Sequence, residues 1–186
     1  MKYYAGIGSR ETPTNVMNLM RKIGADMAEK GYCLRSGGAR GADKAFEDGC
    51  DIVQGAKQII IPYETFNGYE HDGQSVIAGK SIMAYYEKAW GIASTLVSNF
   101  EEQKEFTQEA HTRNVMQVLG RRLDKPVDMV ICYCIMKNGK PTGGTRTAYK
   151  LAKRKGIEVW NLYEPKDYDA WAAKFERKRE KIDWFK

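Results

Sequence analysis

Short runs of apolar residues alternate along the chain with longer segments in which apolar residues recur at helical spacing. The short runs predict strands at Tyr3–Ile7, Tyr32–Ser36, Gln58–Pro62, Val127–Cys134 and Glu158–Tyr163. The periodic segments predict helices at Thr14–Lys30, Ala39–Val53, Ser81–Leu96, Glu102–Leu119, Thr145–Lys155 and Tyr168–Ile182. This alternation is typical of repeated βα units around a mostly parallel sheet.

Two of the predicted strands are apolar without interruption. Ile59–Ile61 and Met129–Cys132 are continuous runs, which indicates strands that helices cover on both faces. We therefore predict an α/β protein built as a three-layer α/β/α sandwich. The segment 63–80 breaks the pattern, because Asn67-Gly68 and Asp72-Gly73 are turn signals, and we predict a long loop there.

The length and apolar content fit one folded domain. The chain has 186 residues, of which 42% are hydrophobic. A chain of this length can bury one hydrophobic core but would be short for two full domains. We expect the domain to span residues 1–165. A basic helix over residues 166–186 is expected to pack on it through its apolar side chains, which are Trp171, Phe175, Ile182 and Trp184.

The sequence also indicates where the protein works. It contains no apolar run of the length that spans a bilayer, about 18 residues, so we expect no membrane partner. Gly6 and Arg10 interrupt the start before a signal peptide core forms, and we expect a cytoplasmic location. The cysteines are expected to be reduced, buried thiols, at Cys33, Cys50, Cys132 and Cys134.

The net charge of +6 is compatible with a nucleic acid partner, with a small phosphorylated ligand or with solubility alone. Its distribution narrows this choice. Residues 150–186 carry eleven Lys or Arg against seven Asp or Glu, so most of the surplus lies at the C-terminal end. Arginines at the predicted helix starts are therefore better guides to a ligand than the bulk charge is.

Three glycine-rich segments follow predicted strands, where α/β domains bind their ligands. The first is Gly6-Ile7-Gly8-Ser9-Arg10. It departs from the dinucleotide fingerprint because Glu11 stands where a third glycine is required, so we infer no NAD. Ser9 and Arg10 remain candidates for contact with a phosphate.

The second segment, Ser36-Gly37-Gly38-Ala39-Arg40-Gly41-Ala42-Asp43, joins a strand to a helix expected to begin near Ala39. Glycines let backbone N–H groups approach an anion closely, and a helix N-terminus favours negative charge. Arg40 adds a bidentate partner for phosphate. Two roles are open for Asp43, which either caps backbone N–H groups or accepts a hydrogen bond from a ligand hydroxyl.

The third segment, Thr142-Gly143-Gly144-Thr145-Arg146-Thr147, again places glycines and hydroxyls at the start of a helix. Three such segments at one sheet edge predict a crevice for a phosphate or nucleotide. Arg113 and Asn114 reach toward it if their helix lines it. The candidate ligand residues are Gly8, Ser9, Arg10, Ser36, Gly37, Gly38, Ala39, Arg40, Asp43, Arg113, Asn114, Gly143, Gly144, Thr145 and Thr147.

Together these motifs resemble the SLOG superfamily, which joins DNA-processing protein A (DprA, also called Smf) with the Lonely Guy phosphoribohydrolases. The matching elements are Gly8-Ser9-Arg10, Ser36–Asp43, Arg113-Asn114 and Gly143–Ala148, and the resemblance extends from Tyr3 to about Leu162. Small stand-alone phage and bacterial DprA-like proteins are the most similar members, through further matches at Leu119-Gly120, Pro126, Asp128 and Asn161-Leu162. The resemblance implies a Rossmann-like nucleotide-binding domain that forms homo-oligomers.

The leading hypothesis is a DprA-like protein that holds a nucleotide or a nucleotide-derived, for example signalling, ligand without a cofactor. An alternative is an N-glycosidase of nucleoside monophosphates, although the third segment lacks the glutamate of the Lonely Guy pattern. Glu11, Asp43 and Glu109 are substitutes that no motif ties to this role. A second alternative is binding of single-stranded DNA by surface lysines. Glu70-His71-Asp72 lacks the spacing of a metal site, so no metal is expected.

Overall fold

A six-stranded parallel sheet forms the centre of the protein, in the order β4-β3-β2-β1-β5-β8. The computed structural model describes residues 1–183, with side chains described as far as residue 176. The strands are β1 (Lys2–Gly8), β2 (Tyr32–Ser36), β3 (Lys57–Ile61), β4 (Val76–Ala78), β5 (Met129–Tyr133) and β8 (Glu158–Asn161). Every pair of neighbours in this sheet is parallel.

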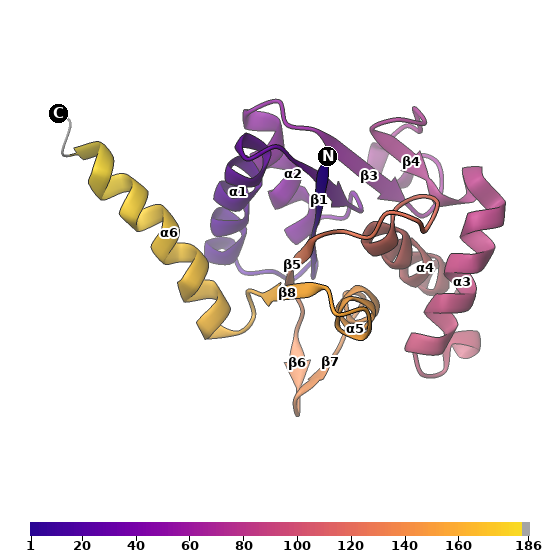
Figure 1. Cartoon of the computed structure of the whole chain (residues 1–186). Helices are drawn as coiled ribbons and strands as arrows, with labels where there is room; N and C mark the ends of the chain where they lie inside the picture. Colours follow the sequence, from indigo (N-terminus) through magenta and orange to yellow (C-terminus); the bar gives the residue numbers. More distant parts are fainter. Residues whose placement is uncertain (184–186) are drawn as a thin grey trace.

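Helices cover both faces of the sheet, which confirms the Rossmann-like three-layer sandwich (Figure 1). One core packs the sheet against α1 (Thr14–Glu29) and α2 (Ala42–Ile52). The other packs it against α3 (Met83–Leu96), α4 (Glu105–Leu119) and α5 (Arg146–Arg154). Neighbouring residues of a strand enter opposite cores, as Tyr4 and Ala5 do.

The predicted loop at 63–80 contains structure that the sequence did not reveal. Val76–Ala78 forms β4, which pairs in parallel with β3 at the edge of the sheet, so the prediction of a loop throughout was wrong. Three residues are too few to show a strand pattern. The remaining short elements are η1 (Phe66–Gly68), η2 (Gly79–Ile82), η3 (Phe100–Glu102), β6 (Met136–Lys137) and β7 (Lys140–Pro141), and the last two form a hairpin.

The C-terminal helix α6 (Pro165–Asp183) begins after β8 and projects away from the sheet (Figure 1). Near its start Trp171 is buried and contacts the Trp160 ring edge-on at 6.0 Å. Phe175 is partly buried against the same core. The side chain of Ile182 and the whole of Trp184 lie outside the described residues. Across residues 1–183, no helix is long and apolar enough to cross a membrane.

The strand order places a switch point beside β1. The chain runs from β1 through β2 and β3 to β4 on one side, then returns to β5 on the other side of β1. The connections leaving β1 and β5 therefore separate to opposite faces and open a crevice at the carboxyl ends of these strands. The glycine segments after β1, β2 and β5 all lie at this edge.

Two helical glycines provide a matched test of the packing between α1 and α2. A Cβ at Gly49 would lie 2.0 Å from the carbonyl oxygen of Arg21, whereas a Cβ at Gly91 of α3 meets no atom within 4 Å. We expect Gly49→Ala to lower the free energy of unfolding by about 1–3 kcal/mol or more, because backbone must move. Gly91→Ala should raise it by about 0.5–1 kcal/mol. Urea unfolding measures both, and equal effects would contradict the packing described.

Candidate functional site

A cavity of about 380 Å³ opens at the carboxyl ends of β1 and β5, at the switch point. Residues from the first and third glycine segments line it together with one face of α4 and two residues of the second segment. They are Ile7, Gly8, Ser9, Arg10, Glu11, Ala39, Asp43, Phe106, Thr107, Ala110, His111, Arg113, Asn114, Ile135, Gly143, Gly144 and Thr145. We call this cavity the switch-point crevice.

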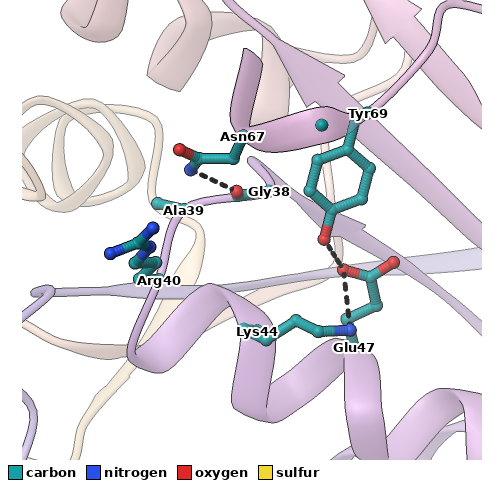
Figure 2. Close-up of a pocket in the computed structure, with 8 residues that line it drawn as sticks. Gly38, Ala39, Arg40, Lys44, Glu47, Asn67 and Tyr69 are labelled. Carbon is teal, nitrogen blue, oxygen red and sulfur yellow. Dashed lines mark hydrogen bonds and ion pairs between the residues drawn. The ribbon is translucent and has the colours of Figure 1, made fainter. Parts of the chain in front are cut away.

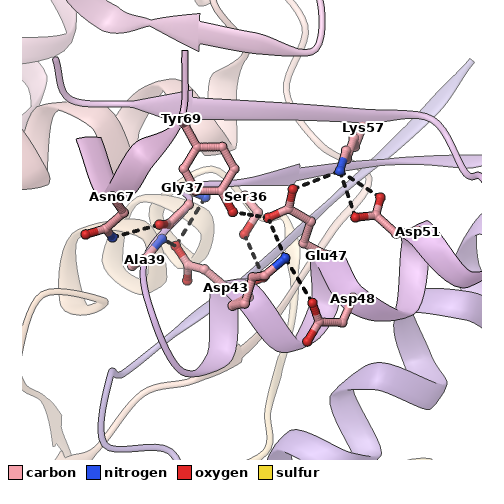
Figure 3. Close-up of polar contacts among 12 residues, drawn as sticks. Ser36, Gly37, Ala39, Asp43, Glu47, Asp48, Asp51, Lys57, Asn67 and Tyr69 are labelled. Atoms are coloured by element: carbon pink, nitrogen blue, oxygen red, sulfur yellow. Dashed lines mark hydrogen bonds and ion pairs between the residues drawn. The ribbon is translucent and has the colours of Figure 1, made fainter. Parts of the chain in front are cut away.

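The Asp43 carboxylate fastens the first two glycine segments together. It accepts hydrogen bonds from the backbone N–H groups of Gly8 at 3.0 Å, Gly37 at 3.1 Å and Ala39 at 3.4 Å. Figure 3 shows this carboxylate pointing into the turn that contains Gly37 and Ala39. The structure thus assigns Asp43 the capping role. The Gly37 amide is already occupied, which corrects its predicted role as a phosphate donor.

Arg113 of α4 approaches the same turn from the opposite side. Its Nη1 donates to the Gly37 carbonyl oxygen at 2.6 Å and lies 3.5 Å from Asp43 Oδ2. Both side chains are less than 10% exposed. Burial lowers the pKa of Arg113 and raises that of Asp43, and the attraction between the two charges opposes both shifts. A side chain at position 37 would displace the Arg113 guanidinium, because a Cβ there would lie 1.4 Å from Arg113 Nη1.

Two further side chains of α4 hold the third glycine segment and the start of α5. Asn114 Nδ2 donates to the Gly144 carbonyl oxygen at 2.7 Å. His111 Nδ1 lies 2.7 Å from Thr147 Oγ1, and both side chains are buried. Burial lowers the pKa of His111 to about 4, helped by the positive charges of Arg146, Arg113 and Lys150. The imidazole is therefore neutral at neutral pH.

Other predicted ligand residues have structural partners too. Ser36 Oγ donates to the Gly6 carbonyl oxygen at 2.7 Å and is fully buried. Gly8 packs against α2 so closely that an added Cβ at this position would lie 2.6 Å from the Cβ of Ala42. Ser36 and Thr147 do not line the switch-point crevice. Their hydrogen bonds instead stabilise the segments around the crevice.

The hydrogen-bond donors of the crevice that are free to bind a ligand come mainly from the third glycine segment. Among residues 1–176, no protein acceptor is hydrogen-bonded to the backbone N–H groups of Gly143, Gly144 and Thr145 or to the Thr145 hydroxyl. Arg10 is exposed, has no ion pair within that part of the chain, and lies 5.6 Å from the Phe106 ring centroid. These donors face a cavity at the N-terminus of α5, where an anion is favoured.

Arg40 and Gly38 belong to a neighbouring cavity of about 420 Å³ rather than to the switch-point crevice (Figure 2). Ala39 lines both cavities. The second cavity contains a polar cluster that the sequence did not single out, in which Glu47 accepts from the Tyr69 hydroxyl and from Lys57 (Figure 3). The single predicted crevice is therefore two adjacent cavities, because Gly38 and Arg40 of the second segment line one of them while Asp43 lines the other.

The three candidate carboxylates have different surroundings. Asp43 is occupied by backbone amides, and Glu109 forms an ion pair with Lys80 and does not line the crevice. Glu11 is exposed at the rim, and among the described residues no cation lies within ion-pairing distance of its carboxylate. Of the candidates, Glu11 is the one left open to a ligand.

Comparisons with known proteins identify no family for this chain. No family model matches it, and no curated protein does. A solved structure of DNA processing protein A from Helicobacter pylori, described as having a unique single-stranded DNA binding mode, matches with 15% identity and a TM-score of 0.40. The match covers 95% of this chain and 81% of that one. A likeness this distant carries no argument about function, and the SLOG resemblance stays a prediction.

Replacing the Asp43 carboxylate tests its role as the fastening between segments. Asp43→Asn puts an NH₂ donor near backbone donors and leaves Arg113 buried without a counter-charge, so we expect a loss of about 3–5 kcal/mol in the free energy of unfolding. Asp48→Asn on the same helix breaks half-exposed ion pairs and should cost about 0–1 kcal/mol. Chemical denaturation gives both values. A loss in Asp43→Asn no larger than that in Asp48→Asn would refute the structural role of the Asp43 carboxylate.

The buried neutral His111 makes stability depend on pH. Its folded pKa of about 4 lies below the ordinary value of 6.5, so the unfolded state binds the proton more tightly. The free energy of unfolding should therefore fall by about 3 kcal/mol as the pH drops from 6.5 to 4. His111→Gln should flatten the profile between pH 6.5 and 5, measured by urea titrations. Identical profiles for the variant and the unmodified protein would contradict this.

Proposed function

We propose that the protein binds a nucleotide or a nucleotide-derived ligand in the switch-point crevice. The phosphate is received by the backbone N–H groups of Gly143, Gly144 and Thr145, with Arg10 and the Ser9 and Thr145 hydroxyls around it. The observation that carries the proposal is this set of unoccupied donors in a crevice beside the Gly8 and Gly37 amides, which are already bonded to the Asp43 carboxylate.

The physical chemistry of the site favours an anion such as phosphate over a neutral ligand. Three consecutive amides at a helix start present partial positive charge, and the α5 dipole adds to it. Arg10 contributes a full charge and a planar pair of donors that matches two phosphate oxygens. Neutral His111 behind Thr147 adds no charge of its own, so Arg10 and the amides set the preference.

The rest of the crevice suits the nucleoside part of such a ligand. Its volume of about 380 Å³ falls within the range of small-molecule sites, which is about 300–1,000 Å³. The Phe106 ring and the Ile135 side chain supply apolar surface on which a base can pack. Charged donors and apolar surface thus line the same cavity, as a nucleotide requires.

Glu11 keeps a second function open, the hydrolysis of an N-glycosidic bond. Such a reaction needs a carboxylate that steadies oxocarbenium charge or activates water. Glu11 lies at the crevice and is not committed to a partner in the described structure. Release of free base from a nucleoside monophosphate, lost in Glu11→Gln and retained in Glu87→Gln on α3, would establish it. No turnover across the four common nucleoside monophosphates would exclude it.

Binding of single-stranded DNA remains an alternative prediction that rests on surface charge. It requires several phosphate contacts, so the logarithm of the binding constant should fall steeply with the logarithm of salt concentration. Binding of a single nucleotide in the crevice should depend only weakly on salt concentration, because few phosphate contacts are made. Titration of a labelled oligothymidylate and of a mononucleotide at several salt concentrations separates the two. Self-association and a cytoplasmic location stay predictions as well.

Calorimetric titration with the monophosphates of adenosine, guanosine, cytidine and uridine tests the proposal against the matching nucleosides. We expect at least one nucleotide to bind about tenfold or more tightly than its nucleoside, because charge-assisted hydrogen bonds to phosphate are lost without it. Arg10→Ala should remove most of this difference. Arg154→Ala, at the far end of α5, should preserve it.

Gly144→Ala gives an independent readout. A Cβ at this position meets no protein atom within 4 Å, so the variant should fold with unchanged stability, yet its methyl group occupies space at the crevice. We expect weaker nucleotide binding with an unaltered melting temperature. Equal affinity for nucleotide and nucleoside, or full affinity in both Arg10→Ala and Gly144→Ala, would contradict the phosphate assignment.

A further inference from the structure

A separate polar cavity of about 190 Å³ lies at the opposite edge of the sheet from the switch-point crevice. It is formed by residues near the amino ends of β1 and β3, by a β2 side chain, and by the connection from α4 to β5, which precedes the amino end of β5. Its lining residues are Tyr3, Arg35, Gln58, Gly120, Arg121, Arg122, Asp124 and Lys125. The cavity is independent of the proposed nucleotide site, since they share no residue.

Arg35 is the central group of this cavity. Its side chain is buried, with 2% of the residue exposed, yet among the side chains of residues 1–176 no carboxylate lies within 4.0 Å of its guanidinium. The partners it has are neutral: Nε donates to Gln58 Oε1 at 3.0 Å, Nη1 donates to the Lys125 carbonyl oxygen at 2.5 Å, and the Tyr3 ring centroid lies 4.0 Å away. Burial lowers the pKa of Arg35, and the Asp124 charge opposes this from beyond ion-pairing distance.

A buried cation without a counter-ion is costly, and proteins normally pair such a charge. Here the neighbouring side chains increase the imbalance instead of relieving it. Arg121, Arg122 and Lys125 are exposed around the same cavity, and none of them forms an ion pair with a described residue. Arg121 Nη1 donates a hydrogen bond to the Gly73 carbonyl oxygen at 3.0 Å. Four cations thus face one carboxylate, Asp124.

We propose that this cavity is a binding site for a phosphate dianion, either inorganic phosphate or the terminal group of a phosphate monoester. Arg122 supplies a planar pair of donors for its oxygens, and the N–H groups of Arg35 and Arg121 that are not bonded to Gln58, Lys125 or Gly73 add further donors. The volume is below the range of about 300–1,000 Å³ for larger ligands, so the cavity takes a group of the size of one phosphate. A dianion neutralises more of the local charge than a diester does, which makes the monoester the favoured form.

Gly120 keeps this cavity open. It ends α4 with φ of +86°, a conformation that disfavours other residues, and a Cβ there would lie 3.1 Å from Arg35 Nη2 and 3.1 Å from the Lys125 carbonyl oxygen. The same turn brings Arg121 and Arg122 to the cavity rim. The sequence therefore places a tight turn and adjacent arginines over a buried arginine from another strand.

The test uses the full chain carrying Gly144→Ala, in which the added methyl group is expected to weaken binding in the switch-point crevice, titrated calorimetrically with sodium phosphate at pH 8 and constant ionic strength. We expect one saturable phosphate site. Adding Arg122→Ala, a change at an exposed residue, should weaken it about tenfold. Adding Arg154→Ala, at an exposed residue of α5, should leave it unchanged. Dimethyl phosphate, a diester probe, should bind more weakly than inorganic phosphate.

Arginine labelling of the unmodified protein locates the site without any substitution. Phenylglyoxal modification, mapped by peptide mass spectrometry, should be slowed by phosphate at Arg122 and unaffected at Arg154. No saturable binding, equal affinity with and without Arg122→Ala, or no protection of Arg122 would overturn the proposal. Equal binding of dimethyl phosphate would overturn its preference for a dianion. Variants at Arg10 report on the nucleotide site alone, so failure of one site is distinguishable from failure of the other.

Discussion

The Asp43 carboxylate is the constraint on which the candidate site depends. It accepts hydrogen bonds from amides that follow two different strands, Gly8 after β1 and Gly37 with Ala39 after β2. These bonds satisfy buried donors that would otherwise be costly to remove from water. They also fix the separation of the two segments, and with it one wall of the crevice. Because Arg113 supplies the counter-charge, α4 is tied to the same point.

Helix α4 carries the constraint across the sheet edge. Every residue from His111 to Leu119 is buried, so this helix is held by packing along its length and presents its polar side chains in fixed positions. Arg113 holds the second glycine segment, and Asn114 holds the third. One helix thereby sets where the open amides of the third segment stand relative to Arg10. A site arranged in this way is formed before a ligand arrives, which reduces the entropy lost on binding.

The sequence predicted the architecture well, because it depends on local patterns. Continuous apolar runs identified the interior strands, and glycines after them identified the ligand edge. The three-residue strand β4 was missed, since its pairing with β3 and not its own pattern makes it a strand. The site was predicted only in part. Whether an amide such as that of Gly37 is open or occupied depends on where the Asp43 side chain points, and this depends on packing between distant segments.

The positions of Arg40 and Arg35 could not be predicted from sequence patterns either. Arg40 follows a glycine turn, as phosphate-binding arginines do, but the turn directs it into the adjacent cavity with Lys44 and Asn67. Arg35 appears in the sequence as one polar residue within an apolar strand. Only the fold brings it beside Arg121 and Arg122, which are far from it in the chain. Contacts of this kind depend on the tertiary arrangement.

The amides of this sheet edge are of two kinds, those that hold the fold and those proposed to receive a ligand. Amide NMR of the ¹⁵N-labelled protein during titration with nucleoside monophosphates distinguishes them. We expect large, saturable shifts at Gly143, Gly144 and Thr145, with small changes at Gly8 and Gly37. Unchanged signals from the third segment, or the largest shifts at Gly8 and Gly37, would contradict it.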